Sequence, residues 1–230
     1  MGSNSIVTTS NEIPTWIIED IKDYHFQTEP WMCWITSIKN ISLTMKKYYQ
    51  SCPSPKIKNF NNAVGARRGI VPEPQTVTHL INKKIYNKVP IKLKEKTNSS
   101  LSEIKSLVER DDTSPVIFSV NSSKYFETIK RNIRLKDIGY DVEGIQDEES
   151  IDHVLIAFEV NEKITFFDPY TPYLDLPGTN TPEKAIFKLS SIVIDQLWYE
   201  AKTAPRWVMW LENVRPYQQN LKIEQKYKQV

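Results

Sequence analysis

A pair of β-rich runs in the second half of the chain constrains the fold more than any other feature. The runs span residues 153–160 and 163–167, and only Asn161 and Glu162 separate them. β-Branched and aromatic residues dominate both runs, which predicts two strands. A two-residue connection predicts that these strands form an antiparallel hairpin. The chain is therefore expected to contain an antiparallel sheet built around this hairpin.

The register of the hairpin decides whether His153 and Asp168 can meet. If the loop has two residues, Val160 pairs with Lys163 and Asp168 falls opposite Leu155. Leu155 and His153 are two residues apart, so they share a sheet face, and Asp168 becomes the diagonal neighbour of His153 at roughly 7–8 Å. A loop one residue longer would break this parity. In the predicted register the carboxylate can fix the tautomer of the imidazole and stabilise its charged form.

The pattern changes from mainly helical to mainly β at about residue 110. Helical periodicity, a capping box and proline breaks predict the helices, and short apolar runs predict the strands. The expected helices lie at about 33–50, 74–84, 101–110, 122–133 and 190–201, and the further strands at 115–120, 185–189 and 206–211. Helices first and strands later indicate an α+β fold in two lobes.

Cys33 opens the first long helix, and Gln27 lies six residues before it. At a helix N-terminus a thiol meets the positive end of the macrodipole and unsatisfied backbone N–H groups. Both favour the thiolate, which is the nucleophilic form of cysteine. The alternative is a small buried residue in a helix. Cys52 is the second of only two cysteines, so no disulfide framework is indicated, and a bridge between them would remove the nucleophile.

Composition excludes several classes of function. A formal net charge of +2 gives no case for nucleic-acid binding, which would call for a concentrated basic face. No apolar run approaches the ~18 residues of a membrane span, and the N-terminus has no Sec signal. We expect synthesis in the cytoplasm, with export by a non-Sec route left open. No Cys/His spacing indicates a metal site and no glycine-rich loop indicates a phosphate site, so we expect no cofactor.

Five other features have ordinary interpretations. His25 is expected in a surface loop, His79 is expected to be structural, and Cys52 is followed by proline and is expected to be structural. Three tryptophans are expected to fill the core, namely Trp198, Trp207 and Trp210. The segment 137–152 carries seven acidic groups and no Lys or Arg. It is by default a solvated loop, and the alternative is an acidic rim or lid beside His153 that selects basic substrates.

Three short motifs occur in the order Q-x5-C-W from Gln27, D-H-V-L-I-A-F from Asp152 and F-F-D-P-Y from Phe166. In this order and context they resemble the papain-like cysteine peptidases. The resemblance covers roughly residues 24–212 and is closest to the compact bacterial branches, the bacteriocin-processing type and the bacterial effector cysteine proteases. It implies a single catalytic domain over 13–215, with a helical lobe over 13–110, a β lobe over 111–215 and the active site in the cleft between them. Residues 1–12 would be a flexible N-terminus and 216–230 a polar tail.

The resemblance also implies roles for single residues. Cys33 would be the nucleophile, His153 the base that forms an ion pair with it, and Asp168 the third member, a place that asparagine fills in papain itself. Gln27 would donate its side-chain amide to the oxyanion hole beside the backbone N–H of Cys33. The residues expected to line the substrate cleft are Trp31, Met32, Trp34 and Asp152. Trp31 and Met32 stand where the papain pattern C-G-S-C-W has small residues.

The implied function is a cysteine peptidase, a thiol hydrolase that cleaves a specific protein or peptide substrate. An effector, processing or defence role in a bacterium or similar microbe is expected, and an activating partner or regulator is compatible with it. Two alternatives stay open. One is a papain-fold acyltransferase, a deamidase or transglutaminase that uses the same Cys-His-Asp set. The other is a catalytically inactive papain-like binding module.

Overall fold

The structure is a computed structural model that describes residues 13–28, 30–66, 73–130, 152–170, 181–202 and 204–214. Its described strands form one sheet in the order β1-β6-β2-β3-β4-β5, in which every neighbouring pair is antiparallel. The strands are β1 (Ile91–Lys96), β2 (Val116–Asn121), β3 (Asp152–Val160), β4 (Lys163–Phe167), β5 (Ile186–Ser190) and β6 (Val208–Asn213). The expected N-terminal and C-terminal tails lie outside the described residues, as does the acidic segment except for Asp152.

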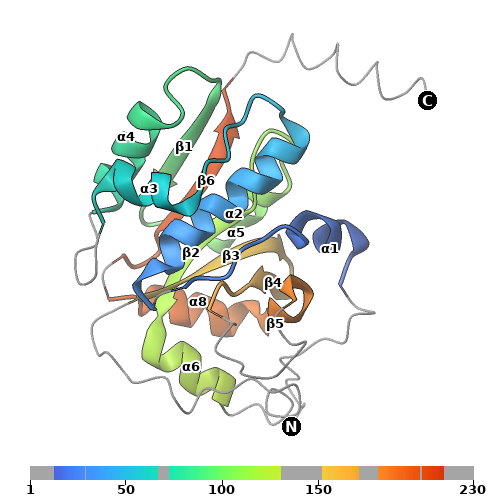
Figure 1. The fold of residues 1–230 in the computed structure, drawn as a ribbon. Coiled ribbons are helices and arrows are strands. Elements are labelled where there is room, and N and C mark those ends of the chain that lie inside the picture. The colour runs from blue at the N-terminus through green and yellow to red at the C-terminus, as the bar shows by residue number, and fades with distance from the viewer. Residues whose placement is uncertain are drawn as a thin grey trace, which may run out of the picture.

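Helices cover both faces of this sheet (Figure 1). One core cluster joins α1, α2, α3 and α4 to one face, and a second joins α5, α6 and α8 to the other. Along β3, Val154 and Ile156 belong to the first cluster, whereas Leu155 and Ala157 belong to the second, as the alternation of a strand requires. The helices are α1 (Thr15–Ile21), α2 (Cys33–Tyr48), α3 (Ile57–Val64), α4 (Pro74–Lys84), α5 (Leu101–Val108), α6 (Ser122–Lys130) and α8 (Ser191–Tyr199), with 3₁₀ turns at Pro30–Met32 and Pro182–Ala185.

The α+β fold class is confirmed by this arrangement. Helix α2 begins at Cys33 and α4 at Pro74, as predicted. The predicted capping box is present at the start of α5, where Ser100 and Glu103 satisfy each other's backbone N–H groups. No helix in the described ranges is long and apolar enough to cross a bilayer.

Strand β1 is an element that the sequence analysis missed. It pairs along its whole length with β6, from Ile91 opposite Asn213 to Lys96 opposite Val208. Ile91 and Leu93 are fully buried while Lys94 is exposed, which is the alternation of a half-buried strand. The N-terminal half therefore contributes a strand to the same sheet as the C-terminal half, and the first half is not purely helical.

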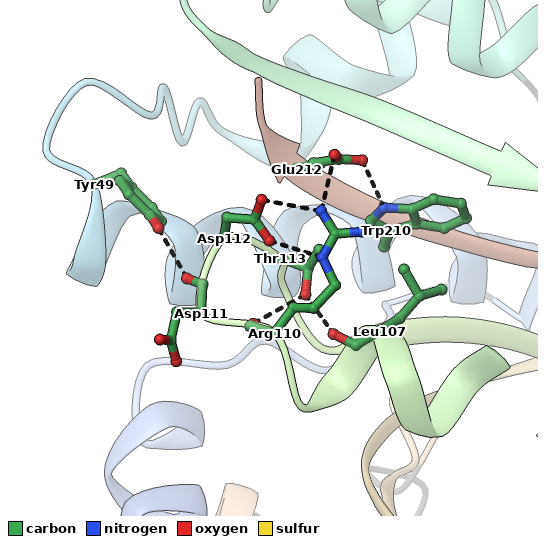
Figure 2. Close-up of polar contacts among 8 residues, drawn as sticks. All are labelled: Tyr49, Leu107, Arg110, Asp111, Asp112, Thr113, Trp210 and Glu212. Carbon is green, nitrogen blue, oxygen red and sulfur yellow. Dashed lines mark hydrogen bonds and ion pairs between the residues drawn. The ribbon is translucent and has the colours of Figure 1, made fainter. Parts of the chain in front are cut away.

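A polar cluster ties the turn after α5 to the neighbouring elements (Figure 2). The Arg110 guanidinium donates to Asp112 at 2.9 and 3.0 Å and to Glu212 on β6 at 3.0 Å. Tyr49, at the end of α2, donates its hydroxyl to the carbonyl of Asp111 at 2.8 Å. The cluster thereby joins the ends of α2, α5 and β6. Because its charges are largely exposed, we expect it to fix geometry more than to add stability.

The β3–β4 hairpin departs from the predicted register at its turn and returns to it near the site. Val160 does not pair with Lys163, so the two-residue loop was wrong. The register then shifts at Phe158, a β-bulge whose extra residue compensates for the longer loop. The observed pairs are Val160–Ile164 and Glu159–Thr165 beside the turn, then Ala157–Phe166 and Ile156–Phe167. Asp168 consequently remains the diagonal neighbour of His153.

Candidate active site

Cys33 is the first residue of α2, directly after the 3₁₀ turn at Pro30–Met32. Proline fits such a position because it has no N–H to leave unpaired. Met32 is the N-cap residue, and its side chain makes no capping hydrogen bond to the helix. The thiol therefore lies at a helix start with orphan N–H groups, as predicted. Cys33 is free of any disulfide and only 4% exposed.

His153 and Asp168 are in direct contact, which confirms the geometric prediction from the hairpin. Nε2 of His153 lies 2.7 Å from Oδ1 of Asp168. Both side chains are buried. The Cys33 thiol lies close enough to His153 to help raise the pKa of its imidazole. Because Asp168 occupies Nε2, Nδ1 is the ring nitrogen left to exchange a proton with the thiol.

The electrostatics of this contact favour a charged pair. Burial alone would lower the pKa of His153, but the charge and hydrogen bond of Asp168 and the contact with Cys33 raise it to about 10. Burial would raise the pKa of Asp168, but the opposing charge and hydrogen bond of His153 hold it below its usual value. Opposite charges in contact each favour the ionised form of the other. Both shifts therefore favour an imidazolium beside a carboxylate.

Aromatic residues that the sequence analysis did not single out surround this pair. The hydroxyl of Tyr125 donates to Oδ2 of Asp168 at 2.7 Å, and the backbone N–H of Tyr170 donates to Oδ1 at 2.8 Å. Ring centroids of Tyr125, Phe126 and Tyr170 lie 5.4, 5.3 and 5.9 Å from the His153 imidazole. The sequence did not reveal the pairing of β2 with β3. Because β3 carries His153, this pairing brings the residues that follow β2 close to the imidazole.

Gln27 is placed by hydrogen bonds at two points of its loop. Its backbone N–H donates to the carbonyl of Pro169 at 2.9 Å, which ties the loop to the residue after Asp168. Two residues earlier, the amide of Asn40 on α2 accepts from the N–H of His25 and donates to its carbonyl, each at 2.8 Å. Gln27 is 2% exposed. The loop is thus fixed between α2 and the end of β4, and the oxyanion role of Gln27 stays a prediction.

The residues predicted to line the cleft around Cys33 are mostly packed into the protein. Trp34 and Met32 are buried, and Trp31 is partly buried against the core that α2 shares with the sheet. The sulfur of Met32 accepts a hydrogen bond from the Thr28 hydroxyl at 3.6 Å. A role of these side chains in binding substrate stays a prediction, and it requires contact through their limited exposed surface.

Asp152, also predicted to bind substrate, has a structural task for both of its carboxylate oxygens. Oδ1 accepts from the backbone N–H of Lys202 at 2.6 Å and Oδ2 from that of Ala204 at 3.2 Å. These bonds anchor the segment between α8 and β6 beside the start of β3. The carboxylate is therefore committed to the fold, and substrate binding by Asp152 stays a prediction that this geometry does not favour.

The other candidates lie apart from this cluster. His25 is in an exposed loop, as expected, whereas His79 is exposed on α4 instead of structural. Cys52 is buried, and burial raises the pKa of its thiol to about 12, as suits a structural residue. Trp198 and Trp207 are buried in the core, and Trp210 packs against it. Among the described residues there is no group of three or more His, Cys, Asp or Glu side chains that could hold a metal ion.

Comparison with known proteins gives one structural likeness. No family model and no curated protein sequence matches the chain. The fold is similar to the crystal structure of a protein from Bacillus anthracis named as a C39-like peptidase, with a TM-score of 0.48 and 13% sequence identity. The match covers 83% of this chain and 94% of that one. At this identity and TM-score we transfer no residue role from it.

Proposed function

We propose that the chain is a cysteine peptidase that hydrolyses a peptide bond in a specific protein substrate. The observation that supports this most is the continuous contact from Asp168 through His153 to Cys33. Nε2 of His153 lies 2.7 Å from Oδ1 of Asp168, and the Cys33 thiol lies close enough to His153 to help raise its pKa. The three residues come from the ends of α2, β3 and β4, so the tertiary fold alone brings them together.

The raised pKa of His153 indicates how this contact could activate the Cys33 thiol. The positive charge of an imidazolium that persists at neutral pH stabilises a neighbouring thiolate. The N-terminus of α2 adds to this stabilisation. A charged histidine beside the thiol is one of the ways in which a cysteine nucleophile is activated. Asp168 orients the imidazole through Nε2 and stabilises its positive charge, which is the role of the third member of a triad.

The reaction follows from these positions. The Cys33 thiolate attacks the carbonyl carbon, a C–S bond forms, and the carbonyl electrons move onto the oxygen. The backbone N–H of Cys33 and the side-chain amide of Gln27 stabilise this oxyanion. Nδ1–H of His153 protonates the leaving amine as the C–N bond breaks. Water then attacks the thioester, His153 accepts its proton, and the thiolate leaves as the carboxylic acid product is released.

Reaction of Cys33 with a thiol-directed probe tests the proposal before a substrate is identified. In the wild-type chain we expect labelling at Cys33 at neutral pH, and His153→Ala should slow it strongly because the thiolate loses its counter-ion. Cys52, buried with a raised pKa, is an internal control that should stay unlabelled, and Cys52→Ser is the matched variant. Labelling of Cys33 that does not depend on His153 would contradict the proposal and favour an inactive binding module.

Mass spectrometry of substrate proteins then separates hydrolysis from acyl transfer. A peptidase gives two fragments that together contain one added water. A deamidase leaves the chain whole and replaces an amide nitrogen by oxygen, and a transglutaminase joins two chains. Only scission that Cys33→Ala abolishes agrees with the proposed function. Candidate substrates come from proteins that are cleaved in the presence of the wild-type chain and intact with the variant, as an effector, processing or defence role requires.

A further inference from the structure

The carboxylate of Asp168 is held from the side opposite to His153 by a tyrosine that has no role in the proposed reaction. The hydroxyl of Tyr125 donates to Oδ2 at 2.7 Å, while Oδ1 faces Nε2 of His153. Tyr125 is fully buried, and its ring centroid lies 5.4 Å from that of His153. One side chain therefore contacts both members of the charged pair, through its hydroxyl and through its ring.

The backbone around Tyr125 is fixed by the sheet and by a helix cap. Strand β2 pairs with β3 so that Val120 lies opposite His153. Asn121 then ends the strand, and its Oδ1 accepts from the N–H of Lys124 at 3.0 Å, the contact of an N-cap residue. Its Nδ2 donates to the carbonyl of Glu200 at 3.1 Å, which ties the start of α6 to the end of α8. Tyr125 follows in the first turns of α6, so its direction toward the site is determined by the fold.

We propose that Tyr125 is a positioning residue that locks the Asp168 carboxylate in the orientation in which Oδ1 faces His153. The inference rests on the proposed function, since it concerns the same pair. A carboxylate that accepts a hydrogen bond on each oxygen cannot rotate about its terminal bond without breaking both. The backbone N–H of Tyr170, which also donates to Oδ1 at 2.8 Å, constrains the same rotation from the segment after β4. Within the described residues, the titratable groups that face the pair are Cys33 on α2, Tyr125 on α6 and Tyr170 itself.

Tyr125→Phe tests this because it deletes the hydroxyl and keeps the ring. The measurement is the rate of Cys33 alkylation by iodoacetamide as a function of pH. On the acid side of this profile, its low-pH limb, the rate falls as the site formed by Cys33, His153 and Asp168 takes up a proton and loses negative charge. Without the donor on Oδ2, Asp168 takes up its proton at higher pH, so the limb should move up by about one pH unit. At a fixed pH below the limb the rate should fall by about tenfold, the equivalent of one pKa unit, and at neutral pH it should stay nearly unchanged.

Tyr86→Phe is the matched control for loss of a buried tyrosine hydroxyl. Tyr86 is also fully buried, and its hydroxyl pairs with Ser42 at 2.6 Å. Its pH profile should match that of the wild type. In an Asp168→Ala background, Tyr125→Phe should produce no further shift, because the proposed effect passes through Asp168. If Tyr125→Phe does not fold, NMR of the wild-type chain should show a slowly exchanging Tyr125 hydroxyl proton that disappears or moves in Asp168→Asn.

The outcomes separate this inference from the proposed function. If wild-type Cys33 shows no labelling that depends on His153, the proposed function fails. If that dependence is present but Tyr125→Phe gives the same limb as wild type and Tyr86→Phe, the positioning role alone is overturned. A shift of equal size in the Asp168→Ala background would also overturn it, because Tyr125 would then act on His153 without the carboxylate.

Discussion

Replacing Asp168 by asparagine isolates the energy of the buried charged pair. The substitution keeps the size of the side chain, so no cavity cost is added, and it replaces the charged carboxylate by a neutral amide with one acceptor oxygen fewer. In the wild-type chain Oδ1 of Asp168 lies 2.7 Å from Nε2 of His153, and both side chains are buried. Removal of one partner leaves the other to be buried as a neutral group or as an uncompensated charge. We expect Asp168→Asn to lower the free energy of unfolding substantially near neutral pH.

The size of the expected loss in unfolding free energy follows from the pKa of His153. A rise from 6.5 to about 10 corresponds to about 5 kcal/mol of preference for the imidazolium in the folded state. Breaking a buried ion pair by removing one partner typically costs about 3–5 kcal/mol, which agrees with this estimate. Since the folded pKa of His153 is raised, its stabilisation is complete below pH 6.5 and is lost as pH rises through about 10. The lowered pKa of Asp168 adds stabilisation that is present above 3.8 and is lost as pH falls further.

Urea unfolding of wild type and Asp168→Asn at about pH 6 and about pH 9 measures this difference. We expect about 3–5 kcal/mol between the two proteins at the lower pH and a clearly smaller difference at the higher pH. Asp112→Asn is the matched control, because Asp112 pairs with Arg110 at an exposed site and should cost less than about 1 kcal/mol at both pH values. An equal loss for Asp168→Asn at both pH values would refute the charged pair, since a neutral contact has no such pH dependence.

The remaining predictions concern three other residues. Gln27→Ala should lower kcat for peptide cleavage by about a hundredfold and leave alkylation of Cys33 nearly unchanged, because alkylation forms no oxyanion; equal effects on both reactions would count against that role. Asp152→Asn should lower the free energy of unfolding by about 1–3 kcal/mol, measured in urea, because a charged acceptor of two backbone N–H groups is lost. Met32→Ala should speed labelling of Cys33 by bulky reagents more than by iodoacetamide, because Met32 is the buried residue that precedes the thiol; a uniform change across reagents would show that Met32 does not restrict access.

The sequence was sufficient where a local signal coincides with a tertiary requirement. Proline at the 3₁₀ turn and helical periodicity after it placed Cys33 at the start of α2. Two runs rich in β-branched and aromatic residues, joined by a short connection, predicted β3 and β4 and put His153 beside Asp168. The contact between His153 and Asp168 was predicted correctly although the assumed two-residue loop was wrong. The loop is one residue longer, and the bulge at Phe158 restores the register. A bulge has no reliable sequence signal, because its cause is the packing of both faces of the sheet.

Pairings between distant segments could not be read from the chain. Strand β1 alternates Ile91 and Leu93 with lysines, but a six-residue edge strand becomes visible only through its pairing with β6. The position of Tyr125 has the same origin. Nothing in the local pattern of α6 marks Tyr125 as a partner of Asp168, and the contact exists because β2 pairs with β3. Both are consequences of strand order, which local propensity does not encode.

Burial of the site has opposite effects on reactivity and access. Cys33 and His153 are each 4% exposed, and exclusion of water strengthens the attraction between the imidazolium and its two partners. The same exclusion leaves little surface for a peptide to reach the thiol. The proposed catalysis would therefore require a conformation in which the residues around Cys33 separate while the contact of His153 with Asp168 persists. The two parts of the site are held differently. Asp168 is fixed by the sheet, by Tyr125 and by the backbone of Tyr170, whereas the approach to the thiol is bordered by a short 3₁₀ turn.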